Sequence, residues 1–232
     1  MIAGWLVLLL AADPAADFNA GLAAQARGEG VAASALYQRA QAEAPGWALP
    51  GFQLAELLLE AGGQPARALT LLEPLVRAEP KNPRGHHLQA LALAEQGDPA
   101  GAEAAERVAL GLRPEYRAAE ETLASALWSQ HKVDQALAEW SGLAQRHPED
   151  TALRAQLVDR LLDAGRPVDA EKELRLLAVD QPQSPVWHRR LARTLDLEGL
   201  TADAETERAL ALKLSGVTPP RRKLRRLPDS KR

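Results

Sequence analysis

The sequence predicts an all-α protein built from repeated helical hairpins, and three observations support this fold class. Ala, Leu, Glu, Arg and Gln dominate the 232 residues, and aromatic residues make up only 4%, a composition that favours helices over strands. A Gly followed closely by a Pro interrupts the helix-forming residues, as in LDAGRPVDAEKEL at 162–174. Related signals recur at a nearly constant spacing, which is typical of repeat proteins.

The N-terminal stretch, residues 1–12, is an apolar run, MIAGWLVLLLAA, without a charged side chain. It is too short to span a membrane as a helix, which takes about 20 residues, but it is typical of the core of a secretory signal peptide. No Lys or Arg precedes the run, and Leu10 stands where a cleavage site prefers a small residue. The alternative is a first helix that packs on the array. We expect an export signal without lipid modification, because no Cys follows.

Six units follow, each marked by the same three signals. Prolines separated by 35, 34, 34 and 34 residues follow the first five units, at Pro45, Pro80, Pro114, Pro148 and Pro182, and the sixth unit ends at Gly216. A glycine marks the inner turn at Gly28, Gly63, Gly97, Gly165 and Gly199, with His131 as the exception. Five residues after each turn lies an alanine: Ala33, Ala68, Ala102, Ala136, Ala170 and Ala204.

Each signal has a physical reason. Gly tolerates the left-handed conformation that ends a helix, and Pro is favoured at the first position of a helix, as expected for Pro167. A Pro after the second helix pushes the preceding residue out of the helical region. Ala permits the close approach of two antiparallel helices. Each unit is therefore expected to be a helix–turn–helix hairpin.

This pattern resembles the tetratricopeptide repeat family, over residues 14–216. The resemblance implies a right-handed α-solenoid of six tandem repeats, with about 12 helices, whose first helices line a concave groove. Some positions depart from the family pattern: its aromatic near the end of the first helix is mostly Leu, and its small residue at the helix crossing is Glu56 in the second unit and Val158 in the fifth. These departures weaken single units without changing the predicted fold.

The resemblance also implies a partner-binding groove with an acidic middle, a basic end, and Trp128 as an aromatic anchor between them. The alternative is that these charges are merely solvated and that Trp128 packs on its neighbours. The family's clamp for a terminal carboxylate uses Lys and Asn, but those places hold residues such as Phe18, Leu22, Gln53 and Leu57, so that clamp is absent. The expected groove residues are His87, Leu91, Glu121, Ser125, Trp128, Asp159, Asp163, Arg189 and Arg193.

No motif predicts catalysis, a cofactor or a metal. The absence of cysteine excludes disulfides, thiolate catalysis and cysteine-based metal sites. His86 and His87 are adjacent on a predicted helix, so they point about 100° apart and cannot hold one metal together. Structural roles are expected for His131, His147 and His188. Asp159 and Asp163 share a helix face, but no cleft partner supports an acid–base pair.

Charge is unevenly distributed along the chain. Up to Gly216 there are 30 Asp or Glu residues and 21 Lys or Arg, whereas residues 217–232 hold seven Lys or Arg and one Asp. We expect this basic tail to be disordered. Anionic lipid, nucleic acid, an acidic protein surface or the acidic body of the chain are its alternative partners. The last predicted helix, Thr201 to Leu214, carries Leu210, Leu212 and Leu214, so it is expected to leave an apolar edge for a partner or for self-association.

The resulting functional hypothesis is a non-enzymatic scaffold that binds another protein in its groove. The Ala/Leu/Arg-rich composition and the export signal favour a bacterial, periplasmic or otherwise exported protein acting in envelope assembly, pilus biogenesis or secretion. The alternative is a cytoplasmic adaptor whose basic tail contacts nucleic acid or anionic membrane. An enzyme built on the repeat has little support.

Overall fold

The structure is a computed structural model, and it describes residues 13–60 and 63–216. The export signal expected at 1–12 and the basic tail expected at 217–232 lie outside these residues. The described part contains twelve helices and no strand, so the predicted all-α hairpin fold is confirmed. The helices are α1 (Pro14–Ala26), α2 (Gly30–Glu43), α3 (Ala48–Glu60), α4 (Pro65–Ala78), α5 (Pro83–Glu95), α6 (Pro99–Leu112), α7 (Arg117–Ser129), α8 (Val133–Arg146), α9 (Thr151–Asp163), α10 (Pro167–Asp180), α11 (Pro185–Leu197) and α12 (Thr201–Leu214).

The inner turns adopt the conformation that the sequence predicts. The backbone φ angle is positive at each turn glycine, with 69° at Gly165, and His131, which replaces glycine in the fourth unit, has φ 59°. Local signals also set the helix starts: Asp98 accepts a hydrogen bond from the Gly101 amide at 2.9 Å, as an N-cap residue does. Proline is the first residue of six helices, α1, α4, α5, α6, α10 and α11.

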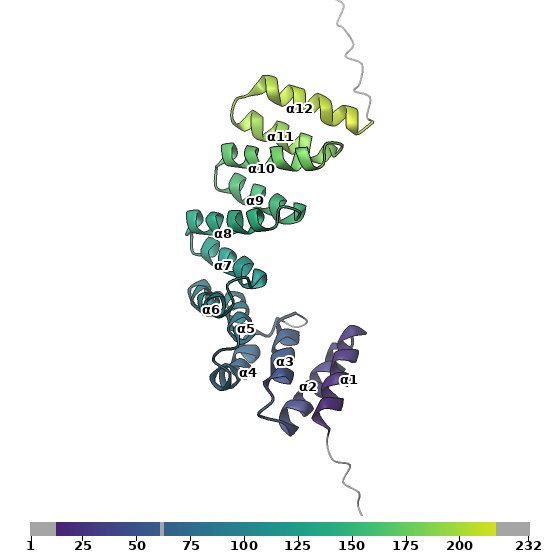
Figure 1. Cartoon of the computed structure of the whole chain (residues 1–232), viewed down its shortest axis with the longest axis vertical. Helices are drawn as coiled ribbons and strands as arrows, with labels where there is room; N and C mark the ends of the chain where they lie inside the picture. Colours follow the sequence, from purple (N-terminus) through teal and green to yellow (C-terminus); the bar gives the residue numbers. More distant parts are fainter. Residues whose placement is uncertain (1–12, 61–62, 217–232) are drawn as a thin grey trace, which may run out of the picture. The chain divides into compact units, whose positions relative to one another are not determined.

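The chain divides into two compact units, residues 1–140 and 141–232, with the boundary inside α8. In the first unit α1–α2, α3–α4 and α5–α6 form hairpins, and the second helix of each hairpin packs on the first helix of the next. In the second unit α9–α10 and α11–α12 are the hairpins, and α10 packs on α11. Figure 1 shows this order of helices within each unit.

The core of each hairpin repeats in register. The six alanines after the turns are all fully buried, as their predicted place at the close approach of two helices requires. The residue four places after each of these alanines is the eighth residue of its helix. We call it the eighth position of the second helix. In the first five hairpins its occupants are buried: Tyr37, Leu72, Glu106, Trp140 and Leu174. Two of these side chains make contacts within their own hairpin: Tyr37 donates a hydrogen bond to Gln25 at 2.6 Å, and the ring of Trp140 lies 5.8 Å from that of Trp128.

Candidate interaction surfaces

His87 lies in the interior of the α5–α6 hairpin. Its Nδ1 is 2.7 Å from Oε1 of Glu106, its ring centroid is 4.9 Å from that of Tyr116, and only 7% of the residue is exposed. Burial raises the pKa of Glu106, against the opposing effect of the hydrogen bond from His87. His87 therefore serves the packing of its hairpin, and half-buried Leu91 likewise packs against the hydrophobic core.

The three expected groove residues of α7 all have partners within the fold. Glu121 forms an ion pair with Arg117, whose Nε lies 2.7 Å from the carboxylate. The Ser125 hydroxyl donates a hydrogen bond to the Glu121 backbone carbonyl at 2.9 Å. The half-buried ring of Trp128 lies 5.8 Å from the ring of Trp140, centroid to centroid. This contact corresponds to the packing role that the sequence left open for Trp128.

Asp159 and Asp163, both exposed on α9, have different surroundings. Asp159 forms an ion pair with Arg190 of α11, which joins the fifth and sixth hairpins. Asp163 is the last residue of α9 and has no ion pair within the described residues. A comparable link connects α5 to α3, where Arg84 pairs with Glu56 at 2.5 Å and also contacts Gln53. Glu56, which departs from the family pattern, is thereby accommodated.

Arg189 and Arg193 are brought together with residues of α12. Both are exposed, and they line a pocket of about 480 Å³. The pocket is also lined by Ala192, Arg208, Ala211, Leu212 and Ser215. Most of these residues belong to α12, and the sequence prediction does not include them because it takes groove residues from first helices only. The expected apolar edge of the last helix was the signal for them, because Leu212 is 39% exposed. This group of seven residues is called the α11–α12 face below.

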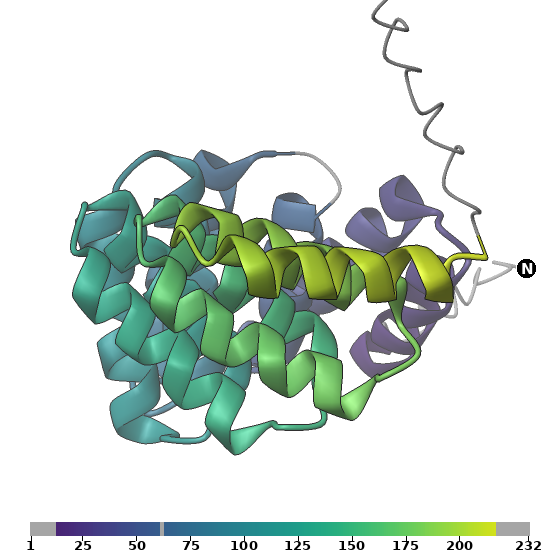
Figure 2. The same cartoon turned by 90° about the horizontal axis from the view of Figure 1, so that it is seen from above.

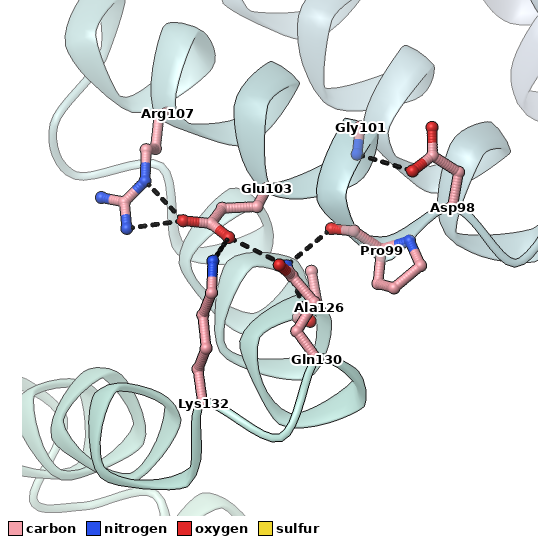
Figure 3. A network of polar contacts seen from close by, with 8 residues as sticks. All are labelled: Asp98, Pro99, Gly101, Glu103, Arg107, Ala126, Gln130 and Lys132. Atoms are coloured by element: carbon pink, nitrogen blue, oxygen red, sulfur yellow. Dashed lines mark hydrogen bonds and ion pairs between the residues drawn. The ribbon is translucent and has the colours of Figure 1, made fainter.

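A second polar cluster, which the sequence did not indicate, surrounds Glu103 on α6. Its carboxylate accepts hydrogen bonds from Lys132 at 2.6 Å and Gln130 at 2.8 Å, and from Arg107 Nε at 3.0 Å. Figure 3 shows the three donors converging on this one carboxylate. The hydrogen bond from Lys132 is the largest cause that lowers the pKa of Glu103 to about 2. The cluster joins α6 to the turn between α7 and α8.

The second unit contains a pair between a buried basic side chain and a half-buried glutamate, and this pair repeats after one 34-residue period. Arg154 Nη1 on α9 is 2.9 Å from Glu173 on α10, and His188 Nδ1 on α11 is 2.7 Å from Glu207 on α12. The ring of His188 also lies 3.1 Å, through Nε2, from the carbonyl oxygen of Pro182. These groups hold the two helices of a hairpin together and do not open onto a surface cleft.

Within residues 13–60 and 63–216, no group of three or more His, Asp or Glu side chains is placed to hold a metal ion. In the same ranges, none of the helices combines the length and apolar character that crossing a membrane requires.

Comparisons with known proteins agree with the hairpin architecture. The sequence model of the tetratricopeptide repeat matches residues 52–117 and 121–185. A tetratricopeptide repeat protein from Parabacteroides merdae superposes with a TM-score of 0.64 at 15% identity, covering 89% of this chain and 80% of that one. YrrB, described as a tetratricopeptide repeat protein with an unusual peptide-binding site, gives 0.61 at 16% identity over 78% and 92% of the two chains.

A third solved structure, MamA from Desulfovibrio magneticus RS-1, gives a TM-score of 0.58 at 18% identity and covers 75% of this chain and 97% of that one. At these identities the likeness concerns the fold alone. No curated protein matches the sequence significantly.

Proposed function

Because the chain belongs to the tetratricopeptide repeat family, we propose that it is a non-enzymatic scaffold that holds another protein on the exposed side chains of its first helices. The repeat fold implies binding to a protein or peptide, since stacked hairpins present an extended concave surface. YrrB, of the same fold, is described as having a peptide-binding site.

The observation that carries this proposal is a set of exposed charges that the fold does not use. Asp163, Arg189 and Arg193 lie on first helices, are exposed, and have no ion pair within the described residues. Charged residues that stabilise the fold are instead paired, as buried Arg154 is with half-buried Glu173. Unpaired surface charges contribute little to folding but can steer and orient a partner.

We further propose that the scaffold acts after export, in bacterial envelope assembly, pilus biogenesis or secretion. The support for this setting is the signal-like run at residues 1–12. Intact-mass measurement of the mature chain purified from its native host tests it, because export with cleavage removes the run. A mature chain that begins at Met1 would favour a cytoplasmic adaptor.

Affinity co-purification from the native host tests the scaffold role. The wild type should recover a partner in stoichiometric amount, and Asp163→Arg should lose it. Asp163 ends α9, where a positive charge suits the helix dipole, so this variant should remain folded by circular dichroism. The matched control is Asp180→Arg, which makes the same charge change at the end of α10, a second helix.

Loss of the partner with Asp163→Arg but not with Asp180→Arg would support binding along the first helices. Recovery of no partner by the wild type, or equal recovery by both variants, would contradict it.

A further inference from the structure

The α11–α12 face is uncovered within the described part of the chain. Within each unit the next first helix packs on the preceding second helix, as α5 does on α4 and α11 on α10. No helix among the described residues follows α12, and Figure 2 shows α12 as the outermost helix of its unit. The pocket of about 480 Å³ between α11 and α12 therefore lies where a following first helix would pack.

The floor of this pocket keeps the apolar character of an inter-hairpin junction. Ala211 corresponds by one 34-residue period to Leu177, which is buried on α10. Leu212 and Ala192 complete the apolar part. A helix with an apolar stripe can pack here as it does elsewhere in the array.

The edge of this pocket, in contrast, carries an exposed positive charge at a position that is buried in the earlier hairpins. The eighth position of the second helix, buried in the five preceding hairpins, is the exposed Arg208 here. Arg208 pairs with Asp196 at 2.5 Å across its own hairpin. A following hairpin that covered this position would remove the guanidinium from water, which is unfavourable without a further carboxylate.

A second reversal concerns the ninth residue of the first helix. This residue is Glu56 in α3 and Asp159 in α9, and each forms an ion pair with an arginine of the next first helix. In α11 the same place holds Arg193. Charge complementarity at this place therefore requires a carboxylate on the incoming helix, and Arg189 one turn earlier adds to the same requirement.

Building on the proposed scaffold function, we infer that the α11–α12 face binds an acidic amphipathic helix of a partner protein. The tail at 217–232 does not fit, because its seven Lys or Arg against one Asp would repel the three arginines. The α1 helix of a second copy does not fit either. Its one acidic residue, Asp17, is only 9% exposed and already pairs with Arg39 at 2.9 Å.

The internal register supplies a defined probe. The probe is a fluorescein-labelled peptide of residues 182–199, the α11 segment, with Arg189→Glu, Arg190→Glu and Arg193→Glu. Binding to the full chain is measured by fluorescence anisotropy. The first control peptide carries Gln at the same three places, and the second is the unchanged segment. The protein variants are Arg193→Glu and, as a control on a side chain of α12 outside the pocket, Lys213→Glu.

We expect the acidic peptide to bind at least about tenfold more tightly than the Gln peptide, because complementary charge decides between them. Arg193→Glu should weaken this binding by about tenfold and improve binding of the unchanged arginine peptide, whereas Lys213→Glu should change neither. Such a reversal of preference between the two peptides is the supporting result, because Lys213→Glu makes the same charge change on α12 and should not cause it.

Three results would overturn the inference: no preference for the acidic peptide, equal binding by Arg193→Glu and wild type, or dimerisation in sedimentation velocity that Arg193→Glu abolishes, which would make a second copy the occupant. A fourth result would also overturn it: a rise in acidic-peptide affinity on replacing Arg225 and Arg226 with Gln, which would identify the tail as the occupant. If the peptide fails while co-purification still depends on Asp163, the scaffold role stands and only this face is wrong.

Discussion

At the scale of single residues, two carboxylates three positions apart on α6 show how environment sets charge. Glu103 faces three donors, and its pKa is lowered to about 2. Glu106 is fully buried, and burial raises its pKa. The first is stabilised as an anion by cations that solvent also reaches, whereas the second is held by one histidine inside a hairpin.

Replacing Glu103 with Gln should lower the free energy of unfolding by about 1–2 kcal/mol near neutral pH. The pKa of Glu103 is lower in the folded state than its ordinary value of 4.5, so its contribution is present above that value and is lost as pH falls toward about 2. Urea unfolding at about pH 7 and about pH 3 should therefore show a difference between wild type and variant that shrinks in acid.

The expected loss of stability is smaller than the full pKa shift of Glu103 would give, because solvent screens the ion pairs. The side chains of Lys132 and Arg107 are 41% and 54% exposed. Glu73→Gln is the control, since Glu73 pairs with Arg77 on an open helix surface. It should change stability by less than about 0.5 kcal/mol. An equal effect of the two substitutions would show that the cluster around Glu103 adds nothing to an ordinary surface pair.

At the scale of elements, the inner turn is the feature that defines each hairpin. Five of the six turns between paired helices use glycine at positive φ, and the fourth uses His131. A Cβ in this region is disfavoured for any L-residue, so the fourth turn is the strained one. The repeat pattern itself indicates this strain, because the fourth unit lacks the turn glycine that the other five units share.

His131→Gly should raise the free energy of unfolding by about 1 kcal/mol, and Gly165→Ala should lower it by about the same amount. Gly111 provides the contrasting control. It lies in α6 without positive φ, and a Cβ there would meet nothing within 4 Å. Gly111→Ala should therefore stabilise the protein by about 0.5–1 kcal/mol. Thermal unfolding of the three variants shows whether each substitution stabilises or destabilises the protein. Stabilisation by Gly165→Ala would contradict the claim that a Cβ is unfavourable at this positive φ.

The hairpins could be predicted from the sequence because their determinants are local. The turn glycines, the buried alanines and the prolines that follow each unit act over a few residues and repeat with the period. The surface could not be predicted in the same way. The repeat register predicts a groove position for His87, but the residue is buried beside Glu106, 19 residues away on another helix. The pocket beside Arg193 likewise depends on α12, which the repeat pattern alone does not assign to a binding surface.

At the scale of the whole molecule, two compact units share one register but differ in charge distribution. The chain to Gly216 is acidic overall, with 30 Asp or Glu against 21 Lys or Arg, yet the α11–α12 face gathers three arginines. In a repeat protein each hairpin contacts only its neighbours, so stability is approximately a sum of local terms. Damage to one hairpin should therefore remain largely local.

Leu72→Ala and Leu174→Ala test this locality, because both residues occupy the eighth position and are fully buried, one in each unit. Each substitution should cost about 2–5 kcal/mol. Native-state hydrogen exchange should show reduced protection mainly in α3–α5 for the first variant and in α9–α11 for the second. The same loss across all helices in both variants would instead indicate one cooperative block.

The shared eighth position also bears on how such a chain can lengthen over evolutionary time. A duplication that copies an interior hairpin preserves the periodic contacts, because Leu72 and Leu174 are equivalent in both the copy and its template. A duplication of the α11–α12 hairpin does not, since it would place the exposed Arg208 guanidinium beside a following hairpin. Substitution of Arg208 by an apolar residue would remove this unfavourable charge. Duplication of interior hairpins is thus a one-step change, whereas duplication of the α11–α12 hairpin needs a second change at Arg208.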